Sequence, residues 1–560
     1  MSEYERWLEN ALDDPDLKKE LEEIKNSPEE INDRFYRDLE FGTGGLRGVI
    51  GAGTNRMNVY TVRKATQGLA NYLKKHAEHP SAAIAYDSRI KSDLFAREAA
   101  AVLAANGVKA HIYPQLSPTP TLSWAVRTLR CDAGICVTAS HNPAKYNGYK
   151  VYGDDGCQIT LKMADDVLAE IEKLDVFHDI RRMDYGKAQA EGLVSLIPDD
   201  VTDRFLDEVM KQRVFSEPCT GLKVVYTPLN GTGRVCVTRI LQMIGVGEVA
   251  VVPEQEFPDG NFTTCPFPNP EIREALQKGL ELCEKVQPDL LLATDPDCDR
   301  CGIAVNRNGE FVLMSGNEVG VLLLDFIARS KKEKGTLPER PVAVTTIVST
   351  DMATPVAEHY GIELRRVLTG FKYIGDQIAL LEQAGETGRY LFGFEESYGY
   401  LSGGYVRDKD AVDASMLICQ MAQYYREKGT TLYDAMEALY QKYGYYENAL
   451  MNFGFEGEDG MLRMGAIMDS LRKNAPAGIA GFKVSGWSDY EASVTSGGQK
   501  IDLPKSNVLE YRLENGGKVI IRPSGTEPKI KAYLSASGSS KEESLALIEK
   551  LKGAVPSLMK

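Results

Sequence analysis

Three observations predict an α/β protein of several domains. Short apolar runs alternate with helical patterns along most of the 560 residues, which indicates sheets whose strands are joined by crossover helices. After residue 450 the apolar runs follow one another more closely and predict a small, mainly antiparallel sheet with a terminal helix. The length corresponds to roughly four domains, and no low-complexity linker separates them.

The elements follow the chain in three α/β segments and one α+β segment. Residues 1 to about 40 are charged and amphipathic and predict helices. The expected strands are 82–86, 109–113, 134–138, 222–226, 249–252, 290–293, 342–346, 362–367, 390–394, 482–485, 508–513, 518–522 and 530–534, and the expected helices are 93–105, 233–244, 352–359 and 541–552. The predicted domains are 1–205, 206–316, 317–450 and 451–560.

Composition limits the classes of partner. Lys and Arg number 65 against 80 Asp and Glu, a formal charge of -15, which argues against nucleic acid as the main partner. The first residues lack the order of a signal peptide, and the apolar stretch 319–328 is too short to cross a bilayer. Ten cysteines in so long a chain do not form a disulfide scaffold. We therefore expect a cytoplasmic protein without a membrane partner.

Ser140 follows the predicted strand 134–138 in the loop Thr138-Ala-Ser-His-Asn-Pro143. A lone serine in a loop is usually a turn residue. His141 beside it suggests a Ser-His triad, but sequence neighbours rarely present their side chains to each other in the required geometry. No G-x-S-x-G motif is present either. A hydrolase triad is therefore not expected.

Asp295, Asp297 and Asp299 follow the predicted strand 290–293. The calcium loop of an EF-hand needs Gly at its sixth place and Glu at its twelfth, where this chain has Arg300 and Asn306. The spacing of two predicts an extended loop whose carboxylates converge on one cation, and oxygen ligands of this kind suit Mg²⁺. The alternative is a solvated acidic turn.

Two further loops are candidates for ligand contact, and a third resembles a cofactor loop only at first sight. Arg522-Pro-Ser-Gly-Thr-Glu-Pro528 exposes backbone N–H groups beside an arginine and could hold a phosphate. Gly393-Phe-Glu-Glu-Ser-Tyr-Gly399 offers a carboxylate and a hydroxyl that could bind sugar hydroxyls. Gly42 to Gly48 lacks the spacing of a dinucleotide loop and follows a predicted helix. Each of the first two could also be an ordinary polar turn.

Together and in this order, these stretches resemble the α-D-phosphohexomutase superfamily. The resemblance includes Tyr146-Asn-Gly-Tyr-Lys150 and extends over nearly the whole chain. The Phe-Glu-Glu-Ser-Tyr-Gly stretch, the chain length and the long N-terminal helical region are most similar to the phosphoglucomutase branch. The resemblance implies a four-domain architecture: three similar α/β domains and a smaller α+β C-terminal domain around a central cleft, each contributing one key loop.

The resemblance also implies roles for individual residues. Ser140 would carry a phosphoryl group and, with Asp295, Asp297 and Asp299, would hold Mg²⁺. Lys150 and His141 would serve in proton transfer, and Arg47 and Arg300 would lie near the transferring phosphate. The implied substrate-binding residues are Glu395, Ser397, Thr369, Gly370, Lys372, Arg407, Lys409, Arg522, Ser524, Gly525, Thr526 and Lys531.

Two positions depart from the family pattern. Gly399 stands where some members have a histidine, and Lys531 stands where a second arginine is common, so charge is retained but bidentate geometry is not.

The implied reaction interconverts glucose 1-phosphate and glucose 6-phosphate, with glucose 1,6-bisphosphate as intermediate and primer. Alternatives are mannose or pentose phosphates as substrates, synthesis of the bisphosphate, or sugar-phosphate binding without catalysis. A monomer or weak homodimer is expected.

Overall fold

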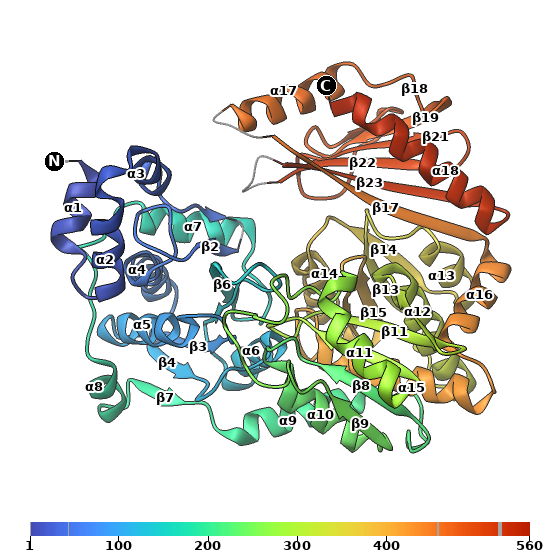
Figure 1. The fold of residues 1–560 in the computed structure, drawn as a ribbon, viewed down its shortest axis with the longest axis horizontal. Coiled ribbons are helices and arrows are strands. Elements are labelled where there is room, and N and C mark those ends of the chain that lie inside the picture. The colour runs from blue at the N-terminus through green and yellow to red at the C-terminus, as the bar shows by residue number, and fades with distance from the viewer. Residues whose placement is uncertain (1, 43, 456–458, 525–528, 560) are drawn as a thin grey trace. The chain divides into compact units, whose positions relative to one another are not determined.

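A computed structural model describes residues 2–42, 44–455, 459–524 and 529–559 (Figure 1). The chain forms two compact units. Unit 1 consists of Met1–Gly316, Ile374–Phe392 and Ser397–Thr431, and unit 2 of Asn317–Tyr373, Gly393–Glu396 and Leu432–Lys560. Among the described helices, none has the length and apolar character needed to span a membrane. The four domain boundaries stay a prediction.

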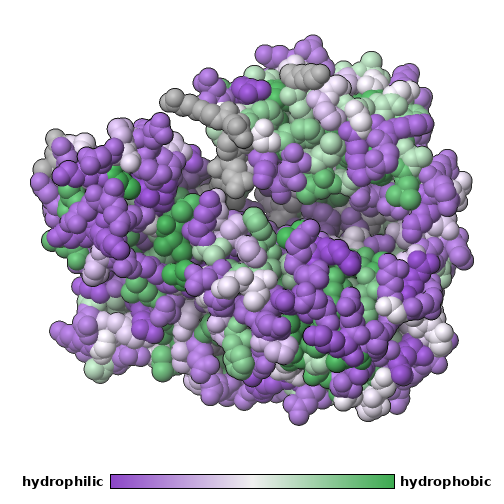
Figure 2. Space-filling model, in the orientation of Figure 1, coloured by the Kyte–Doolittle hydropathy of each residue, from purple (hydrophilic) through white to green (hydrophobic). Residues whose placement is uncertain are grey.

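The N-terminal region is helical, as predicted. It contains α1 (Glu3–Asn10), α2 (Pro15–Glu23), the 3₁₀ helix η1 (Ile24–Asn26) and α3 (Pro28–Phe35). Ser2 forms a capping box at the start of α1, and Asp14 caps α2, which has Pro15 at its first position. Hydrophilic residues predominate on the outer surface of α1 and α2 (Figure 2), whereas Trp7 is fully buried. Its ring packs edge-on against three aromatic rings.

The first sheet of unit 1 has the order β1-β2-β6-β5-β3-β4-β7. Its strands are β1 (Phe41–Gly42), β2 (Gly45–Val49), β3 (Ser81–Tyr86), β4 (Lys109–Ile112), β5 (Ala133–Val137), β6 (Tyr146–Gly153) and β7 (Val194–Leu196). β3 is parallel to β4 and β5, and these three strands match the predicted ranges to within one residue at each end. β6 runs antiparallel to β5 and β2 and was not predicted.

Helices cover both faces of this sheet (Figure 1). They are α4 (Val59–His76), α5 (Ser92–Ala105), α6 (Thr119–Leu129), α7 (Leu161–Ile171), α8 (Tyr185–Ala190) and α9 (Asp199–Lys211). Successive residues of a strand point to opposite faces. Ala82 and Ile84 of β3 accordingly share a core cluster with Phe95 of α5, while Ala83 shares another with Leu122 of α6. The run Ser81–Tyr86 is apolar because both of its faces are covered.

The second sheet has the order β12-β11-β10-β8-β9. It comprises β8 (Lys223–Thr227), β9 (Glu248–Val251), β10 (Leu290–Thr294), β11 (Cys301–Arg307) and β12 (Glu310–Met314), with helices α10 (Gly233–Met243), η2 (Arg273–Leu276) and α11 (Gln277–Val286). β8 is parallel to β9 and β10, and β10 and β11 form an antiparallel hairpin. This hairpin carries the aspartate loop at its tip.

The third sheet has the order β14-β13-β15-β16. Its strands are β13 (Val342–Thr346), β14 (Glu363–Val367), β15 (Tyr390–Glu395) and β16 (Gly399–Leu401), and β13 is parallel to β14. The helices of this part of the chain are α12 (Gly316–Glu333), α13 (Ala353–Tyr360), α14 (Phe371–Gln383), η3 (Thr387–Arg389), α15 (Ala411–Glu427) and α16 (Leu432–Tyr443). β15 ends at Glu395, one of the predicted sugar-binding residues.

The C-terminal sheet is antiparallel, as predicted, with the order β17-β23-β22-β21-β19-β18 and β20 paired to β19. It consists of β17 (Tyr445–Gly454), β18 (Gly478–Ile479), β19 (Phe482–Asp489), β20 (Val494–Thr495), β21 (Leu509–Leu513), β22 (Lys518–Pro523) and β23 (Lys529–Gly538). Its helices are α17 (Gly460–Lys473), α18 (Lys541–Ala554) and η4 (Val555–Met559), and α18 packs on β23 and β17. β17 was not predicted, because neither of its faces is fully buried.

Candidate active site

Ser140 lies in the loop after β5 with a backbone φ of 52°, in the left-handed region. Thr138 Oγ1 accepts a hydrogen bond from the Ser140 N–H at 2.8 Å and donates to Oδ2 of Asp87 at 2.7 Å. The residue is only 4% exposed, and its hydroxyl donates to Oδ2 of Asp295 at 2.9 Å. The loop therefore directs the hydroxyl of Ser140 at the aspartate loop of the second sheet.

The aspartate loop is a turn and not the extended segment that the alternating carboxylates predict. Cys298 has a left-handed φ of 54°. Oδ1 of Asp295 accepts hydrogen bonds from the N–H groups of Asp299 at 3.1 Å and Arg300 at 3.0 Å. Because a carboxylate satisfies backbone N–H groups of its own turn, it favours a turn over an extended strand. The turn still brings the three carboxylates together.

Asp295, Asp297 and Asp299 form a buried cluster. Each offers one carboxylate oxygen, and these oxygens all lie within 4.8 Å of one another. The three residues are at most 1% exposed, which makes the alternative of a solvated acidic turn wrong. Oδ1 of Asp297 and Oδ1 of Asp299 are buried without a hydrogen-bond partner. Buried carboxylate oxygens without donors are costly, and the donor set fits a hard divalent cation.

The carboxylates of this cluster differ in pKa. Burial, followed by the charges of Asp297 and Asp299, raises the pKa of Asp295 well above its ordinary value. Burial also opposes ionisation of Asp297, but the ammonium of Lys150 and hydrogen bonds from Asp295 and Lys150 outweigh it and lower the pKa of Asp297. Crowded carboxylates of this kind are stabilised in their ionised form by positive charge.

Two lysines supply positive charge at this cluster. Nζ of Lys150, on β6, lies 2.9 Å from Oδ2 of Asp297 and 3.8 Å from Oδ2 of Asp299. Burial lowers the pKa of Lys150, but these carboxylates outweigh that effect and raise it above its ordinary value. Nζ of Lys409 lies 3.1 Å from Oδ2 of Asp299 and 3.0 Å from Oδ1 of Asp408. Lys150 and Lys409 thus contact the same aspartate.

His141 contacts Ser140, so the expectation that these neighbours do not meet is wrong. Its Nδ1 lies 3.2 Å from Oγ of Ser140. The left-handed turn at Ser140 rotates the chain so that both side chains lie on one side of the loop. Burial, followed by the charges of Arg300 and Arg47, lowers the pKa of His141 well below its ordinary value, so this imidazole is neutral at pH 7.

The two predicted arginines lie in different sheets of unit 1, Arg47 on β2 and Arg300 between β10 and β11. Arg47 is on β2, directly opposite Gly148 of β6. The short strand β1 lies directly before the glycine-rich loop that leads to Arg47. The expectation that this loop follows a helix is therefore wrong. Nη1 of Arg300 lies 2.6 Å from Oε1 of Glu271, and its Nε lies 3.9 Å from Oδ1 of Asp299.

The segment of Ser397 and the segment of Lys409 meet at Gly399. Tyr398 has a left-handed φ of 65°, and its carbonyl accepts a hydrogen bond from Cys301 N–H at 3.0 Å. A Cβ atom at Gly399 would lie 2.3 Å from Cδ of Lys409. The departure from the family histidine therefore gives Lys409 the space to reach Asp299.

Arg407 is fully buried, and its guanidinium contacts residues outside the predicted site. Its Nη2 donates to Oε2 of Glu382 on α14 at 2.7 Å, and its Nη1 donates to the carbonyls of Gly404 and Val406. None of these three partners is a predicted site residue. Arg407 thus forms an ion pair with Glu382 of α14.

In unit 2, Glu395 lies beside the predicted residues of segment 369–372. Its Oε1 accepts a hydrogen bond from Gly370 N–H at 2.8 Å, and Oγ1 of Thr369 is buried without a hydrogen-bond partner. Nζ of Lys372 lies 5.3 Å from the centre of the Tyr373 ring. A carboxylate and an unpartnered hydroxyl on adjoining segments are groups that can bind sugar hydroxyls.

Arg522 and Lys531 lie directly opposite each other on β22 and β23. In an antiparallel pair, opposite residues place their side chains on the same face of the sheet. The N–H of Ser524 donates to the carbonyl of Lys529 at 2.7 Å. Gly525 and Thr526 lie outside the described residues.

Glu396 provides a pH-dependent contribution to the stability of unit 2. Its Oε2 accepts hydrogen bonds from Thr346 and Ser349. Burial, followed by the charge of Glu395, raises its pKa from 4.5 to about 7. A raised pKa stabilises the folded state fully below pH 4.5, and this stabilisation is lost as the pH rises through 7.

We expect Glu396→Gln to become more stable relative to the wild type by about 2 to 3 kcal/mol between pH 5 and pH 8. Urea unfolding of both proteins at these two pH values measures the change. Exposed Glu339 provides the control, since Glu339→Gln should follow the wild type at both pH values. An equal difference between the Glu396→Gln variant and the wild type at both pH values would contradict this prediction.

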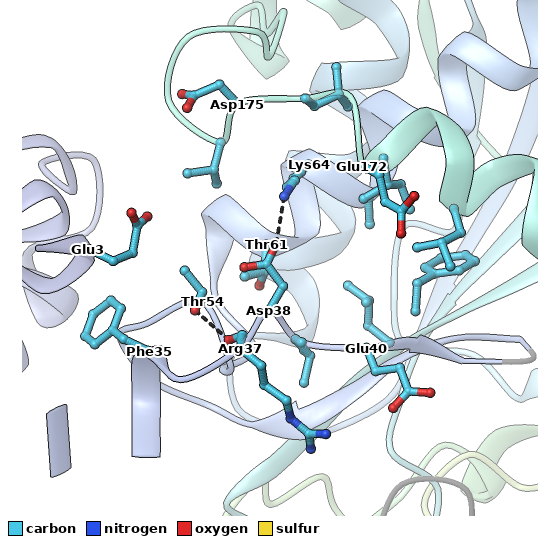
Figure 3. Close-up of a pocket in the computed structure, with 18 of the residues that line it drawn as sticks. Glu3, Phe35, Arg37, Asp38, Glu40, Thr54, Thr61, Lys64, Glu172 and Asp175 are labelled. Atoms are coloured by element: carbon cyan, nitrogen blue, oxygen red, sulfur yellow. Dashed lines mark hydrogen bonds and ion pairs between the residues drawn. The ribbon is translucent and has the colours of Figure 1, made fainter. Parts of the chain in front are cut away.

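The site residues described above do not line the cavity shown in Figure 3. This cavity of about 690 Å³ lies in unit 1 beside the N-terminal helices. Its walls include Trp7, Phe35 and Leu39, and the ion pair between Lys64 and Asp38 crosses it. In unit 1, the side chains suited to catalysis and metal binding instead surround Ser140.

Sequence reasoning missed Asp87 and Arg89, and it gave Asp408 no role of its own. Asp87 accepts a hydrogen bond from the hydroxyl of Thr138, and Arg89 donates to the backbone of the Ser140 loop. Asp408 forms an ion pair with Lys409 and accepts a hydrogen bond from the hydroxyl of Tyr152. Asp87 and Arg89 directly follow the strand predicted at 82–86, so the same rule that selected the other strand-end loops points to them. Asp408 belongs to the segment Arg407-Asp-Lys-Asp410, which resembles a cleft segment of the family.

Known proteins resemble this chain over most of its length. A phosphoglucomutase from Staphylococcus aureus (strain bovine RF122) is 38% identical over 538 residues, which are 95% of this chain and 95% of that protein. A phosphoglucomutase from Staphylococcus haemolyticus is 36% identical over 507 residues, which are 90% of this chain and 91% of that protein.

Solved structures share the fold. A putative phosphomannomutase from Thermus thermophilus matches with a TM-score of 0.68 and 21% identity, over 93% of this chain and 99% of that one. The open form of the phosphoglucomutase pp63/parafusin from Paramecium matches with a TM-score of 0.64 and 18% identity, over 92% and 94%.

All four domains described for phosphoglucomutase/phosphomannomutase match in order. The α/β/α domains I, II and III match residues 38–176, 203–309 and 315–443, and the C-terminal domain matches residues 489–549. These matches agree with the predicted four-domain α/β architecture. With the full-length relatives at 36–38% identity, they establish that this chain belongs to the phosphoglucomutase/phosphomannomutase family.

Proposed function

We propose that this protein is a phosphoglucomutase, an isomerase that interconverts α-D-glucose 1-phosphate and glucose 6-phosphate. One observation carries the proposal: the hydroxyl of Ser140 lies 2.9 Å from Asp295 in a buried cluster of three carboxylates and Lys150. A sugar-phosphate-binding protein without catalysis has no need of this reactive set. The relatives named phosphoglucomutase supply the choice of glucose as the sugar.

The reaction consists of two phosphoryl transfers through Ser140. In the first, the bond between phosphorus and Oγ of phospho-Ser140 breaks, a bond to O6 of glucose 1-phosphate forms, and O6 loses its proton. Glucose 1,6-bisphosphate then reorients and returns its other phosphoryl group from O1 to Oγ of Ser140, and glucose 6-phosphate leaves. Phosphoryl transfer depends on positioning and charge stabilisation, and the two arginines and two lysines of this site provide positive charge.

Lys150 and His141 are assigned to proton transfer. Nδ1 of His141 is within hydrogen-bond distance of Oγ of Ser140, and Nζ of Lys150 is held beside the aspartate cluster. A proton donor or acceptor must reach the reacting oxygen at about 2.6–3.2 Å, and Nδ1 of His141 lies 3.2 Å from one reacting oxygen, Oγ of Ser140. The enzyme requires one group that takes the proton of O6 and later returns a proton to O1.

Magnesium is the proposed metal, held by Asp295, Asp297, Asp299 and the phosphoryl group on Ser140. The unpartnered Oδ1 atoms of Asp297 and Asp299 support this ligand set. When bound, Mg²⁺ would neutralise charge on the transferring phosphoryl group. Glucose 1,6-bisphosphate would serve as the primer that first phosphorylates Ser140.

In the proposed complex, Glu395 and Ser397 bind sugar hydroxyls, while Arg522, Ser524 and Lys531 bind the phosphate that is not reacting. The adjacent positions of Arg522 and Lys531 support the second assignment. An arginine and a lysine on one face of a sheet offer several N–H donors to one phosphate.

We expect Arg522→Ala to raise KM for both phosphosugars by about 10-fold or more, with a smaller change in kcat, because a contact made throughout the reaction contributes mainly to binding. Initial-rate kinetics in both directions measures the two constants. Arg512→Ala is a matched control on the neighbouring strand, since Arg512 is 60% exposed and paired with Glu510. An unaltered KM in the Arg522 variant would remove this residue from the phosphate site.

The substrate assignment is tested by comparing kcat/KM for glucose, mannose and ribose 1-phosphates, with and without glucose 1,6-bisphosphate. The proposal requires glucose 1-phosphate to give the highest value and the primer to increase the rate. Preference for mannose or ribose 1-phosphate would assign a phosphomannomutase or phosphopentomutase instead. Net accumulation of the bisphosphate would assign a bisphosphate synthase.

The proposal also includes a cytoplasmic location and a monomeric or weakly homodimeric protein.

A further inference from the structure

The guanidinium of Arg89 binds four backbone carbonyls of the loop that carries Ser140. Its Nη2 donates to the carbonyl oxygens of Ser140 and Asn142, both at 2.5 Å. Its Nη1 donates to those of Pro143 at 3.0 Å and Tyr146 at 3.1 Å. These contacts engage both terminal nitrogens of the side chain with one short segment, residues 140–146.

Arg89 is itself fixed from two sides. Its side chain and that of Asp87 are fully buried, and Nε of Arg89 lies 3.2 Å from Oδ2 of Asp87. The guanidinium carbon lies 5.0 Å from the centre of the buried Phe262 ring. Asp87 also accepts the hydroxyl of Thr138, so the same carboxylate orients both Arg89 and the residue that binds the Ser140 N–H.

The Ser140 loop requires such support because its conformation is strained. Ser140 has a φ of 52°, and the left-handed region costs an L-residue about 1–2 kcal/mol. A strained backbone persists only where its surroundings over-determine it. Four carbonyls that converge on one point need planar, divergent N–H donors, which a guanidinium supplies and an ammonium does not.

We propose that Arg89 is a positioning residue for the hydroxyl of Ser140. It contacts the loop only through backbone carbonyls and fixes the left-handed turn that directs Oγ of Ser140 at Asp295. This inference rests on the proposed phosphoryl transfer through Ser140. It predicts that the planar arrangement of donors at position 89 matters more than its positive charge.

Arg89→Lys retains the charge and loses the planar arrangement of donors. We expect kcat to fall by about 10²-fold, the size of effect that a misplacement of about 1 Å causes, with KM for glucose 1-phosphate within about threefold of the wild type. Arg89→Ala should be similarly slow. Arg97→Lys is the matched control, because Arg97 lies on α5 with 56% of its side chain exposed. Wild-type kcat in Arg89→Lys would overturn the proposal.

Chemical rescue separates positioning from a general loss of stability. Guanidinium added at non-denaturing, millimolar concentrations to Arg89→Ala should restore kcat by about 10-fold or more, since it can rebuild the carbonyl contacts. Ammonium and urea at equal concentrations should not. Equal effects of all three additives would contradict the proposal. Arg89→Met replaces the alanine variant if that variant does not fold. Failure of every Arg89 variant to fold beside a folded Arg97→Ala would also reject a local role.

Amide hydrogen exchange tests the loop without relying on turnover. Peptides covering residues 138–147 should exchange about 10-fold faster in Arg89→Lys than in the wild type, with the remaining peptides unchanged, since local opening is independent of global unfolding. Unchanged exchange in this segment would overturn the proposal. If the wild type itself lacks mutase activity, the proposed function fails, and this exchange measurement still decides the role of Arg89.

Discussion

Ser140→Ala is expected to lower kcat by at least about 10⁴-fold, the scale at which loss of a covalent nucleophile acts. Without the hydroxyl no phosphoenzyme forms, so the first transfer has no phosphoryl donor and the second has no acceptor. The substitution removes the hydrogen bonds of Oγ with Asp295 and His141 and leaves the buried backbone contacts of the loop in place. The substrate should therefore still bind, and the loss should appear in kcat.

Two measurements check this expectation. A coupled assay for glucose 6-phosphate gives the rate, and intact mass after incubation with glucose 1,6-bisphosphate shows whether one phosphoryl group is gained. The wild type and Ser557→Ala, in which an exposed serine far along the sequence is replaced, should both be phosphorylated. Near-normal turnover of Ser140→Ala in a clean preparation would refute the covalent mechanism.

Asp297→Asn is expected to raise the Mg²⁺ concentration for half-maximal activity by about 10- to 100-fold, the range seen when a metal site is weakened. The variant replaces a charged oxygen donor of the cluster with a neutral amide. It also removes the carboxylate 2.9 Å from Lys150, so kcat should fall even at saturating metal. Removal of the metal with a chelator should abolish wild-type turnover reversibly.

The measurement is a Mg²⁺ titration of activity, with binding of the metal alone followed by calorimetry. The calorimetric result does not depend on turnover and therefore tests the metal site separately from the reaction. Asp207→Asn provides the control, because Asp207 is exposed on α9. Identical titrations for the wild type and Asp297→Asn would place the metal elsewhere or exclude it.

The sequence determined the class of fold and about half of its helices and strands. Strands such as β3, β5 and β10 are covered on both faces and are therefore continuous apolar runs, which a sequence pattern reveals. β6 was missed although it carries Lys150, because its residues Tyr146–Gly153 mix glycine, lysine and tyrosine. β17 was missed because neither of its faces is fully buried.

The sequence also determined which residue types stand at the strand ends, and family resemblance gave Ser140 and the three aspartates their expected roles. Only the tertiary structure decided which of these groups meet. Ser140 and Asp295 are 155 positions apart in the chain, and β5 and β10 belong to different sheets. Their contact therefore depends on how domains pack, which local pattern does not encode.

The tertiary structure alone also revealed what holds the reacting loop. Arg89 stands just after a predicted strand, but its partners are backbone carbonyls, which every residue possesses, so the sequence does not show this contact. The contact of Lys409 with Asp299 likewise depends on the absent side chain of Gly399. Residue types specify the chemistry a site can perform. Burial, backbone direction and close approach specify its geometry, and these arise from long-range packing.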